Sequence, residues 1–263
     1  YEGVELTMWS MWSAGEVQAN AIQAAADAFE AETGAHVNIE WKGRDVNTLI
    51  SAALESGEKL DIFEDDYNRI GHAYAPYTYD LTEMADAVGY DDFSYACFND
   101  QSKEWAGYLN SIVEQPQIGG IFYNKDIFDE NGWTIPTTFS EFEELLAKVA
   151  QTDYVPIALG ATDPWDILFI WEPILAATHL DWIQEYETEG YAAVNDPRVA
   201  DAYNKMIEWG DKGYFGDNWT GVTGQGASLA FSTGSAVMYI GGTWNISTFQ
   251  ENNPALNFGA FQI

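Results

Sequence analysis

The segment that decides the fold is Gly120–Phe142, which reads GIFYNKDIFDENGWTIPTTFSEF. Apolar residues over Ile121–Tyr123 predict a strand. A short helix should follow and end at Gly132, because glycine readily takes the left-handed conformation that closes helices. Thr138 then precedes Glu141 by three residues, the spacing of a capping box, and should begin a second helix. The segment therefore predicts the strand and first helices of an α/β unit.

Upstream of this segment, strand and helix patterns alternate. Strands are expected over Val4–Trp9, Val37–Trp41 and Leu60–Phe63, with a helix capped by Ser13 and a helix over Val46–Glu55 between them. This β-α-β-α-β order predicts a mostly parallel sheet covered by helices. The residues expected to face the core are Ile22, Ala25, Ala26 and Phe29 in the first helix, and Leu49, Ile50, Ala53 and Leu54 in the second.

Downstream, a second α/β series is expected. Strands are predicted over Val155–Leu159, Ala236–Ile240 and Asn257–Phe261. Asp163-Pro164 and Asp196-Pro197 should each begin a helix, because Asp is a favoured cap and proline suits the first helical position. The later of these helices should bury Val199, Tyr203, Met206 and Ile207.

The two series predict two lobes. An irregular stretch over Gly107–Gln117 separates them, so we expect a first lobe over residues 1–112 and a second over residues 113–257. Residues 258–263 should start a crossover back to the first lobe. Because the chain stops inside a strand pattern, we also expect it to be an incomplete version of its natural protein.

The charge of the chain limits the classes of ligand. Ten basic residues against 42 acidic ones give a formal net charge of -32. A shell this acidic should keep the protein soluble and monomeric. It argues against binding to nucleic acids, which requires a basic surface, and disfavours anionic ligands. Three widely spaced histidines and one cysteine predict neither a metal site nor any other cofactor.

Aromatic residues suggest which neutral ligand fits. They make up 15% of the chain, and several of the 11 tryptophans lie beside Gly, Pro, Ser or Asp instead of inside apolar runs. Most aromatic rings belong to the core, but exposed ones can stack on the C–H faces of sugars while carboxylates and amides bind the hydroxyls. A neutral, polar, ring-shaped ligand is therefore expected.

The segment Gly120–Phe142 closely resembles the "YNK…F…G…P.TW.EF" signature of extracellular solute-binding proteins that serve ABC sugar importers, with Phe139 at the usual Trp. Three further segments resemble motifs of that family in the same order: Leu60–Phe63, Asp80–Thr82 and Phe231–Trp244. The resemblance implies a periplasmic-binding-protein-like α/β fold whose two lobes close on a neutral oligosaccharide in the cleft between them. It also implies a binding protein without enzymatic activity or cofactor.

In the first lobe, the candidate ligand residues follow strands, where open α/β sheets bind ligands. Trp12 and Ser13 follow the first strand, although Trp9 before them could be a core or a site residue. The loop after the third strand resembles the ligand-facing loop of the family and could equally be an ordinary solvated loop. Its acids, amide and guanidinium could bind several hydroxyls. These candidates are Asp65, Asp66, Asn68 and Arg69.

The second lobe should contribute an acid and stacking rings. Asp163 and Trp165 occupy the positions where the family places an acid and an aromatic residue, and Trp244 matches a family aromatic in the cleft. Trp165 could instead pack on its own helix, and Trp171 is expected to be a core residue. Polar side chains near the lobe boundary could also reach the ligand, namely Glu114, Gln115 and Gln117.

Two other functions share parts of this pattern. A glycoside hydrolase would need a pair of carboxylates, and 42 acids could include one, but no local signature marks it. A surface carbohydrate adhesin would use the same aromatic rings without a transporter. The transport reading implies ABC permease subunits as partners and an extracellular location, either as a membrane-anchored lipoprotein or in a periplasm.

Overall fold

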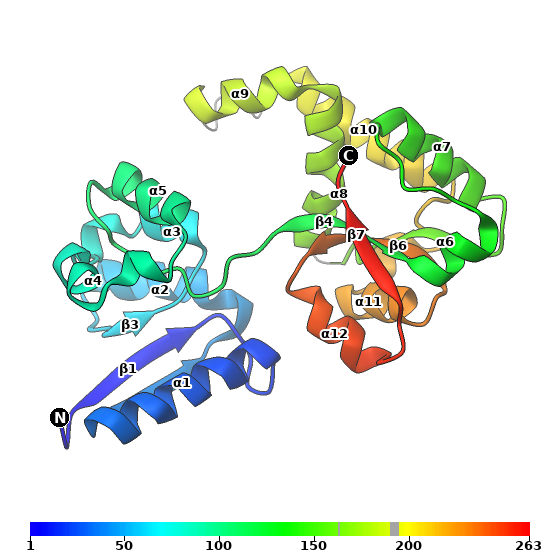
Figure 1. Ribbon diagram of the computed structural model, residues 1–263. Helices are drawn as coiled ribbons and strands as arrows, with labels where there is room; N and C mark the ends of the chain where they lie inside the picture. The colour runs from blue at the N-terminus through cyan, green and yellow to red at the C-terminus, as the bar shows by residue number, and fades with distance from the viewer. Residues whose placement is uncertain (163, 190–194) are drawn as a thin grey trace. The chain divides into compact units, whose positions relative to one another are not determined.

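The computed structural model describes residues 1–162, 164–189 and 195–263. They divide into two compact units, Tyr1–Pro116 and Gln117–Ile263, each built from a sheet and helices (Figure 1). The division falls four residues after the boundary expected at Ile112. None of the described helices is long and apolar enough to cross a membrane.

The sheet of the first unit confirms the expected parallel order. It contains β1 (Glu5–Ser10), β2 (His36–Trp41) and β3 (Ile62–Phe63) in the spatial order β2-β1-β3. Both neighbouring pairs are parallel. Helices α1 (Val17–Thr33) and α2 (Val46–Ser56) connect the strands, so the carboxyl ends of all three strands lie at one edge.

Helix α1 begins later than expected, and the prediction that Ser13 caps it is wrong. Gly15 has a φ of 93°, which right-handed helix does not allow, so the helix begins only at Val17. Half of the capping box survives in the preceding turn. The Ser13 backbone N–H donates to the Glu16 carboxylate at 2.7 Å.

The expected core faces are correct only in part. In α1, Ile22 is buried, but Ala25 and Phe29 are exposed. In α2, Ile50 is buried and Leu49 is exposed. Periodicity identifies one face of a helix, but it does not show how far along that face a neighbouring sheet extends.

Trp9 belongs to the core of the first unit, which settles the alternative left open by the sequence. It is 8% exposed and packs with Ile50 and Tyr74. The unit is completed by α3 (Tyr67–His72), α4 (Thr82–Val88) and α5 (Ala96–Ala106), and by short 3-10 helices over Gly43–Asp45, Ala75–Tyr77 and Tyr90–Asp92.

The second unit contains a mixed sheet in the order β5-β6-β4-β7. Strands β5 (Val155–Ala158) and β6 (Ala236–Gly242) are parallel, and β4 (Gly119–Asn124) is antiparallel to β6. The expectation that residues 258–263 leave this lobe is corrected. Residues Phe258–Phe261 form β7, whose backbone pairs with β4 and is stabilised by ladder hydrogen bonds within the unit.

The segment Gly120–Phe142 forms the predicted elements. Strand β4 leads into α6, which ends at Gly132 in the left-handed conformation, and Thr138 Oγ1 accepts a hydrogen bond from the Glu141 N–H at 3.2 Å. The helices of the unit are α6 (Lys125–Asn131), α7 (Phe139–Val149), α8 (Pro164–Thr178), α9 (Leu180–Glu189), α10 (Pro197–Asp211), α11 (Gly224–Ser232) and α12 (Asn245–Asn252), with a 3-10 turn over Trp219–Gly221.

Helix α10 begins as predicted, but its buried face is shifted. Asp196 caps it by accepting the Arg198 N–H at 2.8 Å. Tyr203 and Ile207 are exposed, although the sequence pattern placed them in the core. The buried face of the helix consists of Val199, Ala202, Met206 and Trp209. Successive buried residues are three or four positions apart, as expected for one face of a helix.

Candidate functional site

In the first unit, three loops meet at the carboxyl ends of the parallel strands. Trp12 follows β1, Arg44 follows β2, and Glu64 follows β3 directly. Because β1 lies between β2 and β3, the side chains of these loops can contact one another.

The indole of Trp12 is held from two directions. Its Nε1 donates to Glu64 Oε1 at 2.6 Å, and the Arg44 guanidinium lies 4.6 Å from the ring centroid. Arg44 is itself fixed by the Glu16 carboxylate at 2.9 Å and by the Met11 carbonyl at 2.6 Å. Such a cation–π contact covers one face of a ring and restrains its orientation. Trp12 is half-buried, and Ser13 beside it is exposed.

Glu64 is a site candidate that sequence reasoning missed. Nothing local distinguishes it among 42 acids, and its only signal is that it directly follows a strand. Burial raises the pKa of Glu64. The pKa of Glu114 is raised to about 7, mainly because its carboxyl group is partly buried and also because the charge of Glu64 is close to it. Two acids of the same unit therefore compete for a proton beside Trp12.

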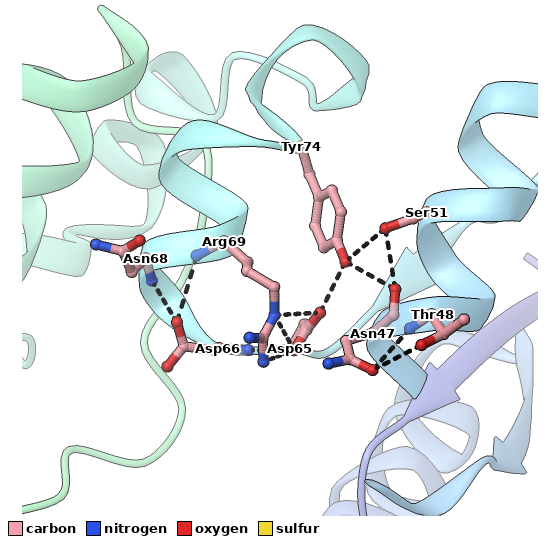
Figure 2. A network of polar contacts seen from close by, with 8 residues as sticks. All are labelled: Asn47, Thr48, Ser51, Asp65, Asp66, Asn68, Arg69 and Tyr74. Carbon is pink, nitrogen blue, oxygen red and sulfur yellow. Dashed lines mark hydrogen bonds and ion pairs between the residues drawn. The ribbon is translucent and has the colours of Figure 1, made fainter. Parts of the chain in front are cut away.

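The loop after β3 is ordered by hydrogen bonds among its own side chains and with Tyr74 (Figure 2). The Asp65 side chain is 1% exposed, and Arg69 donates to its Oδ1 through Nε at 3.1 Å and through one Nη at 2.8 Å. The Tyr74 hydroxyl donates to Asp65 Oδ2 at 3.0 Å. Asp65 is therefore committed to Arg69 and Tyr74, whereas the Arg69 side chain remains 32% exposed.

Asp66 caps the next helix. Its Oδ1 accepts the backbone N–H groups of Asn68 at 3.0 Å and Arg69 at 3.3 Å, which fixes the start of α3. Asp66 and Asn68 are exposed. This is more order than a solvated loop requires, and direct contact of these four residues with a ligand remains a prediction. Glu114 and Gln115 are exposed as whole residues in the segment that ends the unit, although the Glu114 carboxyl group itself is partly covered.

In the second unit, the parallel strands β5 and β6 bring their carboxyl ends together. Trp165 lies in the first turn of α8 after β5, and Trp244 follows β6. Phe169, one turn beyond Trp165, places its ring centroid 5.1 Å from that of Trp244. Phe169 was missed because it lies in an apolar helical run typical of a core. Asp163 lies outside the described residues.

The exposures of the tryptophans on α8 differ. Trp165 is 55% exposed, so a large part of its indole faces solvent. Trp171 packs against the core as expected: it stacks on Tyr203 at 4.9 Å and donates from Nε1 to the Val199 carbonyl at 3.3 Å.

Polar groups border this aromatic surface. Strand β4 starts opposite the end of β6, where Thr243 Oγ1 donates to Gln117 Oε1 at 2.6 Å. The Asp166 carboxylate lies against two glycines. A Cβ added to Gly160 would lie 2.7 Å from Asp166 Oδ2, and one added to Gly224 would lie 2.8 Å from it. Burial of the Tyr239 hydroxyl group raises its pKa, and the nearby charge of Asp166 raises that pKa further. An acid and an amide thus accompany the rings.

Gly242 provides the surface on which the Trp244 ring rests. A Cβ at position 242 would lie 1.7 Å from Trp244 Cζ3. Gly242→Ala should therefore displace the indole and lower the free energy of unfolding by about 1–3 kcal/mol, the usual cost of overpacking. Denaturant unfolding followed by tryptophan fluorescence measures both effects. Gly221→Ala is the control, because nothing lies within 4 Å of a Cβ there. Equal stability of the two variants would contradict this packing.

Comparison with known proteins identifies the family. The family model for bacterial extracellular solute-binding proteins matches residues 24–263. This chain belongs to that family. The match includes the loop after β3 and, in the second unit, Trp165 and Trp244.

Curated relatives carry sugar-binding names. A multiple sugar-binding protein of Streptococcus mutans is 24% identical over 156 residues, which cover 57% of this chain and 37% of that protein. A probable sugar-binding periplasmic protein of Rhizobium meliloti is 26% identical over 165 residues, which cover 62% of this chain and 39% of that protein. The chain spans less than half the length of the curated relatives that it matches.

Solved structures of sugar-binding proteins have the same fold. A chitin oligosaccharide binding protein superposes with a TM-score of 0.82 at 24% identity, covering 99% of this chain and 67% of that one. A solute-binding protein named RafE, in complex with raffinose, gives a TM-score of 0.76 at 18% identity. The superposition covers 99% of this chain and 68% of that one. The expected two-lobed periplasmic-binding-protein-like α/β fold is thereby confirmed.

Proposed function

We propose that this protein is the sugar-capturing subunit of an ABC importer and that its ligand is a neutral oligosaccharide. The observation that carries the proposal is the row of rings in the second unit, where exposed Trp165 shares a helix face with Phe169, which contacts Trp244. Several rings in a row suit a ligand with several sugar rings. Each ring can stack on a C–H face of the ligand.

The first unit has groups of its own that suit a sugar. Trp12 offers a ring restrained by Glu64 and Arg44, and Arg69 offers a partly exposed guanidinium held by Asp65. A ring fixed before the ligand arrives loses little freedom on binding, which favours affinity. We assign the contacts with hydroxyl groups to Asn68, Arg69, Glu114, Gln115 and Gln117, together with the acids of the second unit.

Related proteins support transport over catalysis. The relatives are named for sugar binding, and the similar structures include receptors for raffinose and for chitin oligosaccharides. The proposed partners are the permease subunits of the transporter. With a net charge of -32, the protein is proposed to act as a monomer outside the cell, either lipid-anchored or periplasmic.

A thermal-shift screen of the full-length protein tests the function. Neutral oligosaccharides should raise the melting temperature, because a ligand that binds only the folded state stabilises it by about 2.7 kcal/mol at 100 times its dissociation constant. Acidic sugars at equal concentration should have no effect. Failure of every neutral sugar in a broad panel would refute the proposal.

Two further measurements separate the alternatives. Release of reducing sugar during incubation would indicate a glycoside hydrolase. Solution scattering should show compaction on addition of the sugar, whereas an adhesin need not change shape.

A further inference from the structure

Glu64 fixes both the ring and the backbone of Trp12. Its Oε1 accepts the Trp12 indole N–H, and its Oε2 accepts the Ser10 hydroxyl, both at 2.6 Å. Ser10 is fully buried, and its Oγ accepts the backbone N–H of Trp12 at 3.2 Å. One carboxylate therefore determines where the ring lies.

Glu64 also faces other charged groups of the same unit. Arg44, after β2, lies over the Trp12 ring and is paired with Glu16 at 2.9 Å. Glu114, in the segment after α5, has its carboxyl group near enough to that of Glu64 for each to affect the pKa of the other. Two carboxyl groups this close cannot both ionise without strong repulsion, so they hold one proton between them over part of the pH range.

We infer that Glu64 is a positioning residue that acts on the sugar through Trp12, and that the proton it shares with Glu114 couples sugar affinity to pH. The action of Glu64 on the sugar and the coupling to pH both rest on the proposed function. It goes beyond that function by naming a positioning residue, Glu64, outside the sugar contacts and by making sugar affinity depend on pH.

The sign of the coupling follows from the hydrogen bonds. The pKa of Glu114 is raised to about 7, so its carboxyl group is protonated below this pH and donates a hydrogen bond to Glu64. The two carboxyl groups then bind each other instead of the sugar. Above it, Glu114 is ionised as well, and its carboxylate can only accept hydrogen bonds, which sugar hydroxyls donate. Binding should therefore tighten as pH rises and should release a proton. A pKa difference of one unit between free and bound protein corresponds to about a tenfold change in affinity.

The positioning of Trp12 is tested without any sugar. In an NMR titration of the full-length protein, the indole N–H signal that Trp12→Phe removes should shift with a single midpoint near pH 7. Glu114→Gln and Glu64→Gln should both abolish this transition, because each removes one of the two acids. Glu58→Gln changes an exposed acid of the same unit and should preserve it. A Trp12 signal that does not titrate near pH 7, or that titrates unchanged in Glu114→Gln, would overturn the inference.

Calorimetry then tests the coupling, using the neutral oligosaccharide with the largest thermal shift. Affinity should rise up to about tenfold between pH 6 and pH 8, and Glu114→Gln should remove the rise. Glu64→Ala should weaken binding at both pH values, whereas Glu64→Gln should largely restore it, because its amide oxygen can still accept the indole N–H. An affinity that is constant or falls with pH would overturn the coupling. If no sugar binds at any pH, the proposed function and the coupling fail together, and the NMR titration still decides the role of Glu64.

Discussion

Trp165→Ala should weaken the binding of a neutral oligosaccharide by about 10- to 100-fold. Trp165 is 55% exposed in the first turn of α8, so alanine removes a stacking surface without opening a large cavity in the core. A stacked aromatic ring contributes about 0.5–1.5 kcal/mol beyond the apolar area that it buries, which together give about 1–3 kcal/mol, and each 1.4 kcal/mol is tenfold in affinity. Titration calorimetry gives the affinity, and a thermal melt of the ligand-free protein should be nearly unchanged.

Trp171→Ala is the matched control on the same helix. Trp171 stacks on Tyr203 and packs against the core, so its loss should lower the free energy of unfolding by about 3 kcal/mol. The remaining folded protein should bind sugar with near-normal affinity. An affinity of Trp165→Ala within twofold of the parent, a difference well under about 1 kcal/mol, would show that the ring is not part of the site.

The sequence pattern predicted the elements well, because strands and caps depend on local residue order. Gly120–Phe142 formed the predicted strand and helices, and Thr138 and Asp196 cap the helices that they were expected to cap. Ser13 failed for an equally local reason, the positive φ of Gly15. The sequence offers no sign that this particular glycine would take that conformation.

Partners that come from separate strands could not be predicted in this way. Trp12 and Glu64 are 52 residues apart and meet only because β1 and β3 are neighbours. Phe169 and Trp244 likewise meet across β5 and β6. Asp65 was expected to bind ligand from the loop's composition, yet its carboxylate accepts a hydrogen bond from Tyr74, which lies outside that loop. Position after a strand identified the region, but only tertiary contacts assign a role to each side chain.

Asp65→Ala should be strongly destabilising, because Asp65 is the buried acceptor for two other side chains. It pairs with Arg69 at 2.8 Å and accepts from Tyr74 at 3.0 Å, and its own side chain is 1% exposed. Removing one partner of a buried ion pair costs about 3–5 kcal/mol, since the other charge remains unpaired. The partial exposure of the Arg69 side chain places the expected loss near the lower end of that range. Denaturant unfolding of the ligand-free protein measures it.

The neighbouring acid provides the control for Asp65. Asp66→Ala removes only the cap of α3 and should cost about 1 kcal/mol, although it changes the same residue type in the same loop. Asp65→Asn should fall between the two variants, because its amide oxygen can still accept the Tyr74 hydroxyl while the charge opposite Arg69 is lost. If Asp65→Ala is no more destabilising than Asp66→Ala, the carboxylate does not hold the loop, and its predicted role as a direct sugar ligand becomes the better explanation for an acid at this position.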